Sequence, residues 1–496
     1  MNVAELSGFA VGLAFGVVAC GVQNATPLDA APSMPATSSP EHFTGNRAVV
    51  RGSTFFTRSE RFNRYYTDVG YTPSRRVYVG AEATGDGSSR DKPMAVQQGL
   101  DALAAGDMIV FTRSAKPYSA CYTVARGGTY DAPVVLYAER NDDGSRGVEI
   151  KCAGTENKNE SCLNLMSPDY VAVDGFTLTG GSYGVRAEGK SYPASGHMVG
   201  LAVLNVDGRS SYRDPIFAAQ TDWTVVQQNL GHGGGKRDGH GIYLSNGGDW
   251  SIARYNELWD NMSSTFQINA DPEYVCSPDG TAFDDPECDG SALEGKGRGI
   301  SEYVLVENNF FHDTLGPNFA SVRNSIVRNN VSWVTGRHNA SFYQETKNPK
   351  LGTSSNVVAH NLFVNLTVNH VVQFIEHSTN NHVVNNAFLS LTSAGSASGA
   401  GVVMQIDSTV DQNVYEGNVY VGGKLLGRTV GSNEYAEASL DPAWFAGWSL
   451  TPTLSGLVPV AGTPFAKKGN LLTEAPLDYF GVVRTSPVDI GPFSVR

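Results

Sequence analysis

The chain has 496 residues and a formal net charge of −13, which argues against nucleic acid as a partner because phosphate binding needs a basic surface. Charged residues make up only 17% and glycine is abundant, so strands and turns should outnumber helices. The length exceeds that of a typical compact domain, but a solenoid escapes this limit because each repeat contacts only its neighbours.

The N-terminus carries an apolar run from Phe9 to Ala19 that ends at Cys20. The run is too short to span a membrane and fits the h-region of a signal peptide. Val17-Val18-Ala19-Cys20 resembles the lipobox of bacterial lipoproteins, so the resemblance implies lipidation at Cys20. The alternative is a plain signal peptide over residues 1–20 with an incidental cysteine. We expect export to the bacterial outer membrane or cell surface as a lipoprotein, or secretion, and membrane contact only through the lipid.

Residues 21–46 are rich in Pro, Ser, Thr and Ala and have no apolar periodicity, which predicts a flexible linker. From Val77 to Thr112 the pattern is strand, turn, helix and strand. Pro93 opens a short helix predicted over Met94–Ala105, with apolar residues at helical spacing. Such a helix is a sensible plug for the open end of a solenoid core.

The cysteines after Cys20 fall into two close pairs and one remainder. Cys152 lies near Cys162, and Cys276 lies near Cys288, which predicts two local disulfides in an exported protein. Cys121 is left over.

One short phrase recurs from about Thr224 to Asn418: apolar or β-branched residues, two polar residues, then asparagine, as in TVVQQN and VLVENN. Strand phrases at this spacing, with no helical pattern between them, are typical of a solenoid. Stacked asparagine amides can hydrogen-bond along the stack, so we interpret these residues as structural. They are Asn229, Asn256, Asn309, Asn330, Asn361, Asn386 and Asn418.

Residues 271–299 interrupt the rhythm with an acidic stretch. Asp285, Glu287, Asp289 and Gly290 are similar to the start of a calcium loop, but Lys296 occupies the position of the closing glutamate, so an EF-hand is excluded. The alternative to a calcium site is a solvated excursion closed by a disulfide.

Three segments resemble right-handed parallel β-helix proteins of the pectin-lyase-like group. They are the entry segment YVGAEATGDGSSRDKP, the stretch GHGIYLSNGGDW and the tail DYFGVVRTSPVDIG. The resemblance implies an all-β fold: a right-handed parallel β-helix solenoid with a short N-terminal capping helix. We expect the β-helix over 77–430 with an insertion at 271–300, and a C-terminal cap or tail over 431–496. The fold hosts lyases, hydrolases, epimerases and non-enzymes, so it does not decide the function.

A second set of short strands lies between the asparagine phrases, aligned as GVRAE, GIYLS, TFQIN, FASVR, SFYQE, VQFIE and VMQID. Because side chains alternate along a strand, the third and fifth places should face solvent. The third places form an aromatic stripe that would bind substrate, namely Tyr243, Tyr343 and Phe374. The fifth places stack the acids Glu345, Glu376 and Asp407 about 5 Å apart, close enough to raise each other's pKa unless a cation lies among them.

These residues favour a polysaccharide lyase acting on a uronate polymer, most simply as a monomer. Such an enzyme needs a base and a cation that neutralises the substrate carboxylate. The candidate calcium ligands are Glu345, Glu376, Asp407 and Asn269; the candidate bases are Lys347 and His338; the candidate uronate clamps are Arg323 and Arg337. The stretch FYQETKNPKLGTSSNVVAHN also resembles the calcium-dependent alginate and chondroitin lyase family. That family has a catalytic arginine on the next coil, where this chain has Glu376-His377.

Two alternatives stay open. A glycoside hydrolase could use Glu345 with Glu376 or Asp407, and Asp238-Gly239-His240-Gly241 resembles an element of polygalacturonases. A tethered, non-catalytic surface protein that binds glycan also fits an acidic solenoid.

Overall fold

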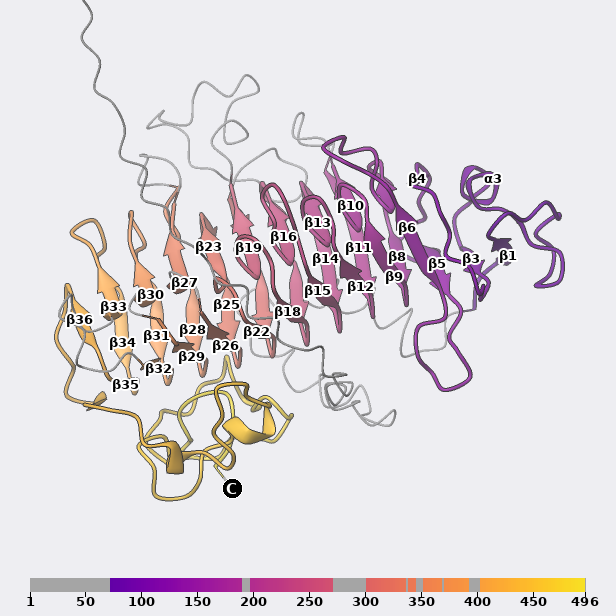
Figure 1. The fold of residues 1–496 in the computed structure, drawn as a ribbon. Helices are drawn as coiled ribbons and strands as arrows, with labels where there is room; N and C mark the ends of the chain where they lie inside the picture. The colour runs from indigo at the N-terminus through magenta and orange to yellow at the C-terminus, as the bar shows by residue number, and fades with distance from the viewer. Residues whose placement is uncertain are drawn as a thin grey trace, which may run out of the picture.

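The computed structural model describes residues 72–189, 197–270, 300–335, 338–344, 351–367, 370–391 and 402–495. Three long parallel sheets run side by side along the molecule (Figure 1). Sheet A has thirteen strands, and sheets B and C have eleven each. The chain visits sheets A, B and C in turn, and each strand pairs with the strand one coil later, as β14 does with β17.

The strands of sheet A are β2 (Met94–Ala95), β1 (Arg75–Gly80), β3 (Asp107–Phe111), β5 (Val134–Ala138), β8 (Val171–Asp174), β11 (Met198–Leu204), β14 (Thr221–Gln227), β17 (Ile252–Arg254), β21 (Leu305–Glu307), β25 (Ile326–Arg328), β28 (Val357–Ala359), β31 (His382–Val384) and β34 (Val414–Glu416).

Those of sheet B are β6 (Glu149–Cys152), β9 (Thr177–Gly180), β12 (Asp207–Arg209), β15 (Leu230–His232), β18 (Glu257–Trp259), β22 (Phe310–His312), β26 (Val331–Val334), β29 (Leu362–Asn365), β32 (Ala387–Ser390), β35 (Val419–Val421) and β37 (Tyr435–Glu437).

Sheet C holds β4 (Tyr122–Val124), β7 (Leu163–Leu165), β10 (Val185–Glu188), β13 (Ile216–Ala219), β16 (Ile242–Ser245), β19 (Phe266–Asn269), β23 (Asn318–Ala320), β27 (His338–Tyr343), β30 (His370–Phe374), β33 (Val402–Ile406) and β36 (Lys424–Leu426). A short extra ladder joins β20 (Ser301–Glu302) to β24 (Val322–Arg323).

The core fills the space between the three sheets, because alternate residues of each short strand point inward. Like side chains stack from coil to coil. On sheet C, Phe319 lies 4.8 Å from Phe342, which lies 4.7 Å from Phe374 (ring centroids). All three rings are at most 1% exposed.

The asparagine ladder lies at the corner between sheets A and B, and its predicted structural role is confirmed. Asn309 is typical: its Nδ2 donates to Asn330 Oδ1 at 2.9 Å and to Ala253 O at 3.0 Å, while its Oδ1 accepts from the Asn256 backbone. Residues just before the ladder adopt positive φ, which turns the chain at each corner. The ladder ends where Asn418 donates to Glu434 Oε1.

The N-terminal end of the core is covered by helix α3 (Val96–Asp101), where a longer helix was predicted. Val96 and Leu100 are buried against the first coils. Met94 and Ala95 form β2 instead, since their pairing with β1 satisfies backbone groups that a helix start would leave unpaired.

The C-terminal region, residues 438–495, covers the later part of the outer face of sheet B (Figure 1). It contains two 3-10 turns, η4 (Pro442–Trp444) and η5 (Ser455–Leu457). Its Phe465 and Ile490 pack against outward-facing apolar residues of the sheet such as Val364 and Leu389.

The predicted Cys152–Cys162 disulfide is wrong. Cys152 is bonded to Cys121, with a Cα–Cα distance of 4.9 Å, and Cys162 is a buried thiol. Cys121 precedes β4 and Cys152 ends β6, so coil stacking rather than sequence proximity brings them together. Burial raises the pKa of Cys162 to about 12, as expected for an unreactive core thiol. Cys276 and Cys288 lie outside the described residues.

Candidate functional site

The outer face of sheet C carries one continuous row of polar and aromatic side chains, one from each coil. We call it the sheet C row. Inward-facing residues such as Leu244 and Phe319 flank it along each strand. In register, its members are Asn164, Arg186, Phe217, Tyr243, Gln267, Asn318, Ser341, Gln373 and Gln405.

Hydrogen bonds order the sheet C row. Arg186 donates from Nη1 to Asn164 Oδ1 at 2.9 Å, and Gln373 donates from Nε2 to Ser341 Oγ at 2.6 Å. Asn164 and Ser341 are buried, whereas Arg186, Tyr243 and Gln373 are half-buried. Hydrogen bonds therefore hold the side chains of the row in place, and Arg186, Tyr243 and Gln373 are partly accessible to solvent.

Aromatic rings gather toward the N-terminal end of the sheet C row. Tyr183 lies 4.8 Å from Phe217, which lies 5.4 Å from Tyr243 (ring centroids). Tyr243 was predicted to face outward and does so. From β23 onward the row consists of amide and hydroxyl side chains, so its two ends differ chemically.

A charged corner adjoins this aromatic end, just before β13 and β16. Arg213 is ion-paired with Asp238, and Asp214 Oδ1 accepts the His240 backbone N–H at 2.6 Å. Burial, and then the charge of Asp238, raise the pKa of Asp214 well above its usual range. Burial also lowers the pKa of His240 to about 4, so this imidazole is neutral at physiological pH.

Sequence reasoning found His240 but missed Arg213 and Asp214. The available signal was their position in the turn that leads into IFAA, a strand that the alignment of outward-facing strands omitted.

The predicted register was wrong over three coils. The true partners of Gln267 on the next three coils are Asn318, Ser341 and Gln373, so the FASVR, SFYQE and VQFIE alignments slip by three, two and one residue. The single-residue slip turns Phe374 from a predicted substrate contact into a core residue, 0% exposed. The double slip keeps Tyr343 outward but moves it to the neighbouring row.

Glu376 and Asp407 are neighbours but not the stacked pair that was predicted, because Phe374 pairs with Ile406 and offsets them by one position. Partial burial and then the charge of Asp407 raise the pKa of Glu376. Partial burial alone would raise the pKa of Asp407, but hydrogen bonds from Thr409 and from the Glu376 backbone lower it.

The carboxylate oxygens of Asp407 already accept hydrogen bonds from neighbouring groups. Asp407 Oδ1 accepts from Thr409, and its Oδ2 accepts from the Glu376 N–H at 3.0 Å. Within the described part of the chain no three His, Cys, Asp or Glu side chains converge as a metal site would require. The Asn269 amide instead donates to Tyr243 Oη at 3.3 Å.

Arg323 was predicted to face solvent as a uronate clamp, but it lies at the corner that leads into sheet A. Its Nε is 3.3 Å from Glu302 Oε1, and both side chains are largely buried. Glu302 and Asp249 form part of a ladder in which Asp249 Oδ1 accepts the Glu302 N–H at 2.8 Å. Burial, and then Asp222, raise the pKa of Asp249 well above its usual range. This ladder is an internal support of the corner.

The remaining predicted residues are not placed. Arg337, Glu345 and Lys347 lie outside the described residues, as does the acidic stretch 271–299. His338 is the first residue of β27 and pairs with His370, but its side chain is not described.

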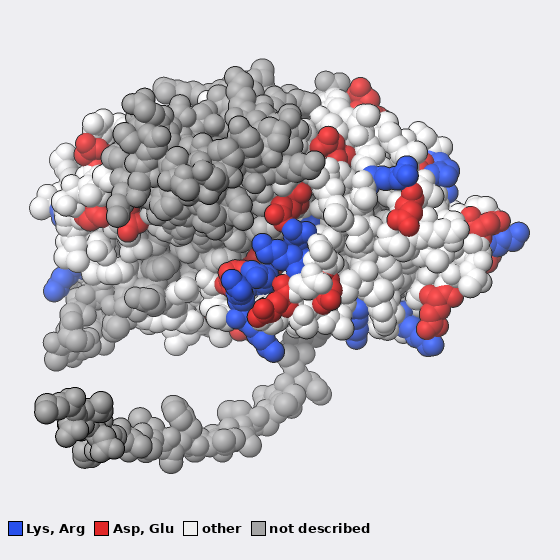
Figure 2. Space-filling view, turned by 90° about the horizontal axis from the view of Figure 1, so that it is seen from above, with Lys and Arg blue, Asp and Glu red and all other residues white. Residues whose placement is uncertain are grey.

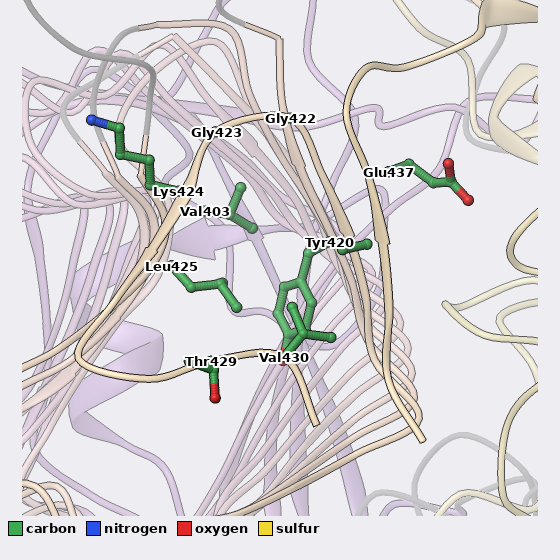
Figure 3. Close-up of a pocket in the computed structure, with 10 residues that line it drawn as sticks. Val403, Tyr420, Gly422, Gly423, Lys424, Leu425, Thr429, Val430 and Glu437 are labelled. Atoms are coloured by element: carbon green, nitrogen blue, oxygen red, sulfur yellow. The ribbon is translucent and has the colours of Figure 1, made fainter. Parts of the chain in front are cut away.

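A cavity of about 320 Å³ lies at the C-terminal end of the solenoid (Figure 3). Its walls come mainly from Val403, Tyr420, Leu425 and Val430. The charged side chains of Lys424 and Glu437 point away from one another on opposite sides (Figure 3). The cavity is therefore lined mainly by apolar side chains at the end of the core, and its charged side chains do not converge on one point.

Surface charge is uneven despite the negative total. Figure 2 shows one group of lysine and arginine side chains interleaved with acidic ones, while the other charges on that face are scattered. Among the described residues, no helix has the length and apolarity to cross a bilayer.

Comparison with solved structures places this geometry among known folds. Pectate lyase Pel9A superposes with a TM-score of 0.54 at 13% identity, over 86% of this chain and 98% of that chain. The fold is a right-handed parallel β-helix. At this identity the similarity establishes the fold alone, and it confirms the fold class predicted from the sequence.

Other matches have lower TM-scores. A rhamnogalacturonan lyase aligns at 0.48 and 13% identity over 82% of this chain and 99% of its own, and the mannuronan C-5 epimerase AlgE6 A-module of Azotobacter vinelandii at 0.44 and 11% over 69% and 92%. These neighbours are carbohydrate-active β-helix proteins. No protein-family model and no curated protein matches the sequence.

Proposed function

We propose that the protein binds an acidic polysaccharide lengthwise on the outer face of sheet C and cleaves it by β-elimination. The sheet C row carries this proposal, because it supplies one hydrogen-bonding or aromatic side chain per coil over nine coils. Coils are spaced by about 4.8 Å, close to the length of one sugar unit in an extended polysaccharide. A repeating ligand can therefore meet a repeating surface in step.

Two features support an anionic sugar. Arg186 is a half-buried cation within the row, and Arg213 lies beside its aromatic end. Arg323 is ion-paired with Glu302 at a corner of the solenoid, whereas Arg186 lies in the sheet C row, where it is ion-paired with Glu188. Arg186 is therefore the candidate for contact with a uronate carboxylate, which would replace Glu188 as its partner. Elimination is the cleavage that such a carboxylate permits, because it acidifies the proton on the adjacent carbon.

The first experiment mixes the purified protein with a panel of uronate polymers and follows the ultraviolet absorbance of the conjugated double bond. We expect growth of this absorbance, weaker after Arg186→Gln and after Lys347→Ala. Calcium stays a prediction, and EDTA tests it: abolished activity that returns with added calcium would support it. A flat trace across the panel without new reducing ends would contradict catalysis and favour a non-catalytic glycan-binding protein.

Hydrolysis is a second candidate, favoured by the opposite pKa shifts of Glu376 and Asp407. A carboxyl with a raised pKa beside one with a lowered pKa is the division of roles that a general acid and an ionised partner need. New reducing ends without ultraviolet absorbance would identify hydrolysis. Glu376→Gln should then abolish cleavage, whereas Asp411→Asn, an exposed acid on the next coil, should not.

We further propose export, with Cys20 as the lipid attachment site. The Cys121–Cys152 disulfide supports this, because structural disulfides persist in oxidising compartments. Labelled palmitate fed to expressing bacteria should enter the wild-type protein but not Cys20→Ala. Labelling of neither protein, with the chain found in the medium, would favour plain secretion.

A further inference from the structure

Tyr243 is the member of the aromatic end whose hydroxyl contacts an amide of the neighbouring coil. It projects outward from β16, where the aromatic end of the sheet C row meets the amide side chain of Gln267, and it is half-buried. On either side in register lie Phe217 and Gln267. The phenol oxygen is therefore held where a sugar on the sheet C row would lie.

Two ring contacts hold the Tyr243 side chain in place. Phe217 meets it edge-on at 5.4 Å and 73°, and His240 meets it at 4.9 Å and 66°. His240 is itself fixed, because its Nδ1 lies 2.6 Å from Ser264 Oγ and its backbone N–H donates to Asp214. Since burial keeps this imidazole neutral, His240 orients the ring without competing for protons at physiological pH.

The hydroxyl of Tyr243 accepts a hydrogen bond from Asn269 Nδ2 at 3.3 Å. This contact fixes the position of the phenol oxygen on the outer face of sheet C. Asn269 is 5% exposed, so this donor acts from within the protein rather than from solvent.

We propose that Tyr243 is a catalytic proton-transfer residue of the sheet C face and that Asn269 is its positioning residue; this rests on the proposed elimination. The Tyr243 phenolate takes the proton from the sugar carbon next to the carboxylate. The electron pair of that C–H bond forms the new double bond, and the bond to the glycosidic oxygen breaks. Tyr243 then returns the proton to the departing oxygen, so the phenolate is restored and no co-reactant is consumed.

The test compares Tyr243→Phe with Tyr137→Phe in the full-length protein, using the polymer that the panel identifies. Tyr243→Phe keeps the ring and its packing but removes the reacting oxygen. We expect kcat to fall about 100-fold or more with KM little changed. Tyr137 lies on β5 of sheet A, so Tyr137→Phe should keep the wild-type kcat.

Asn269→Asp separates positioning from packing, because aspartate has the same size but its carboxylate cannot donate. We expect kcat to fall while KM stays near wild type; the thermal unfolding midpoint should also fall, because the new carboxylate is buried, so the split between kcat and KM is the readout that reports positioning. Full activity of Tyr243→Phe would overturn the role of Tyr243 and leave the proposed function standing. A wild-type protein that forms no unsaturated product would instead overturn the proposed function, and this inference with it.

Discussion

The outer faces of sheets B and C are built on the same coils, but they differ in what covers them. From β22 onward, sheet B turns apolar side chains outward, among them Phe310, Val364 and Leu389, and the C-terminal region covers them. Over the same coils, sheet C turns outward the amide and hydroxyl side chains of the sheet C row. Strand geometry is the same on both faces, and only the residue type at the outward positions differs.

This difference shows that the residue type at the outward positions decides whether a face of the solenoid is covered or exposed. Burial of apolar outward residues stabilises the folded state by about 25 cal/mol for each Å² removed from water. The C-terminal region of the chain therefore packs over them. Polar outward residues gain little from such a cover and are suited to a hydrated ligand such as a sugar. Stability should therefore depend on sheet B and its cover, and ligand binding on sheet C.

The largest expected effect on stability comes from disrupting the packing of the C-terminal region, which covers sheet B. Phe465 is 1% exposed and packs against Trp444 and Phe445, with ring centroids 5.9 and 5.4 Å away. Phe465→Ala should lower the free energy of unfolding by about 3–5 kcal/mol through the lost contacts and the cavity. Urea unfolding followed by intrinsic fluorescence measures this.

Leu471→Ala serves as the control for Phe465, because Leu471 belongs to the same region but is 55% exposed. Its effect should stay within about 0.5 kcal/mol. Equal effects of the two substitutions would contradict a stabilising role for the cover.

The asparagine ladder supplies the next effect. Asn330 Nδ2 donates to Val306 O at 2.9 Å and to Asn361 Oδ1 at 3.0 Å, and its Oδ1 accepts from Asn309. Asn330→Ala leaves these buried partners without their hydrogen bonds and should lower the free energy of unfolding, measured in urea, by about 2–4 kcal/mol. The same change at Asn318 of the sheet C row should cost less than about 1 kcal/mol. A larger loss at Asn318 would reverse the assignment of the two regions.

A smaller effect, on binding alone, should follow in the sheet C row. Gln373→Ala removes one accessible amide whose Nε2 donates to Ser341 Oγ. We expect polysaccharide affinity to fall by about 1 kcal/mol, roughly fivefold, with unfolding unchanged. Calorimetric titration with the polymer measures the first and urea unfolding the second, and unchanged affinity would argue against ligand contact at this coil.

The smallest effect concerns pH and His312, the last residue of β22 in sheet B. Burial alone would lower the pKa of His312, but hydrogen bonds to Asp313 and Glu257 raise it above its ordinary 6.5. The resulting stabilisation is full below pH 6.5 and is lost as pH rises through the raised pKa. The excess stability of wild type over His312→Asn should therefore shrink between neutral and alkaline pH, and a constant difference would contradict it.

The repeating phrase was enough to predict the solenoid and the role of its asparagines, because both depend on local patterns that recur in every coil. Asn386 and Asn418 were recognised even where the phrase weakens, and both are in the ladder. Tyr243 was recognised as outward-facing for the same reason, since GIYLS alternates without interruption.

Tertiary structure alone decided which side chains meet across coils. Connections of unequal length separate the asparagine corner from each sheet C strand, so the pairing of FASVR, SFYQE and VQFIE could not be counted along the chain. The predicted alignment of VQFIE was off by one residue, so Phe374 faces the core and not the solvent. Glu376 is offset by one position from Asp407, so the two acids do not stack as predicted. The Cys121–Cys152 bond has the same origin: the two residues are 31 apart in sequence, and stacking of successive coils brings their Cα atoms within 4.9 Å.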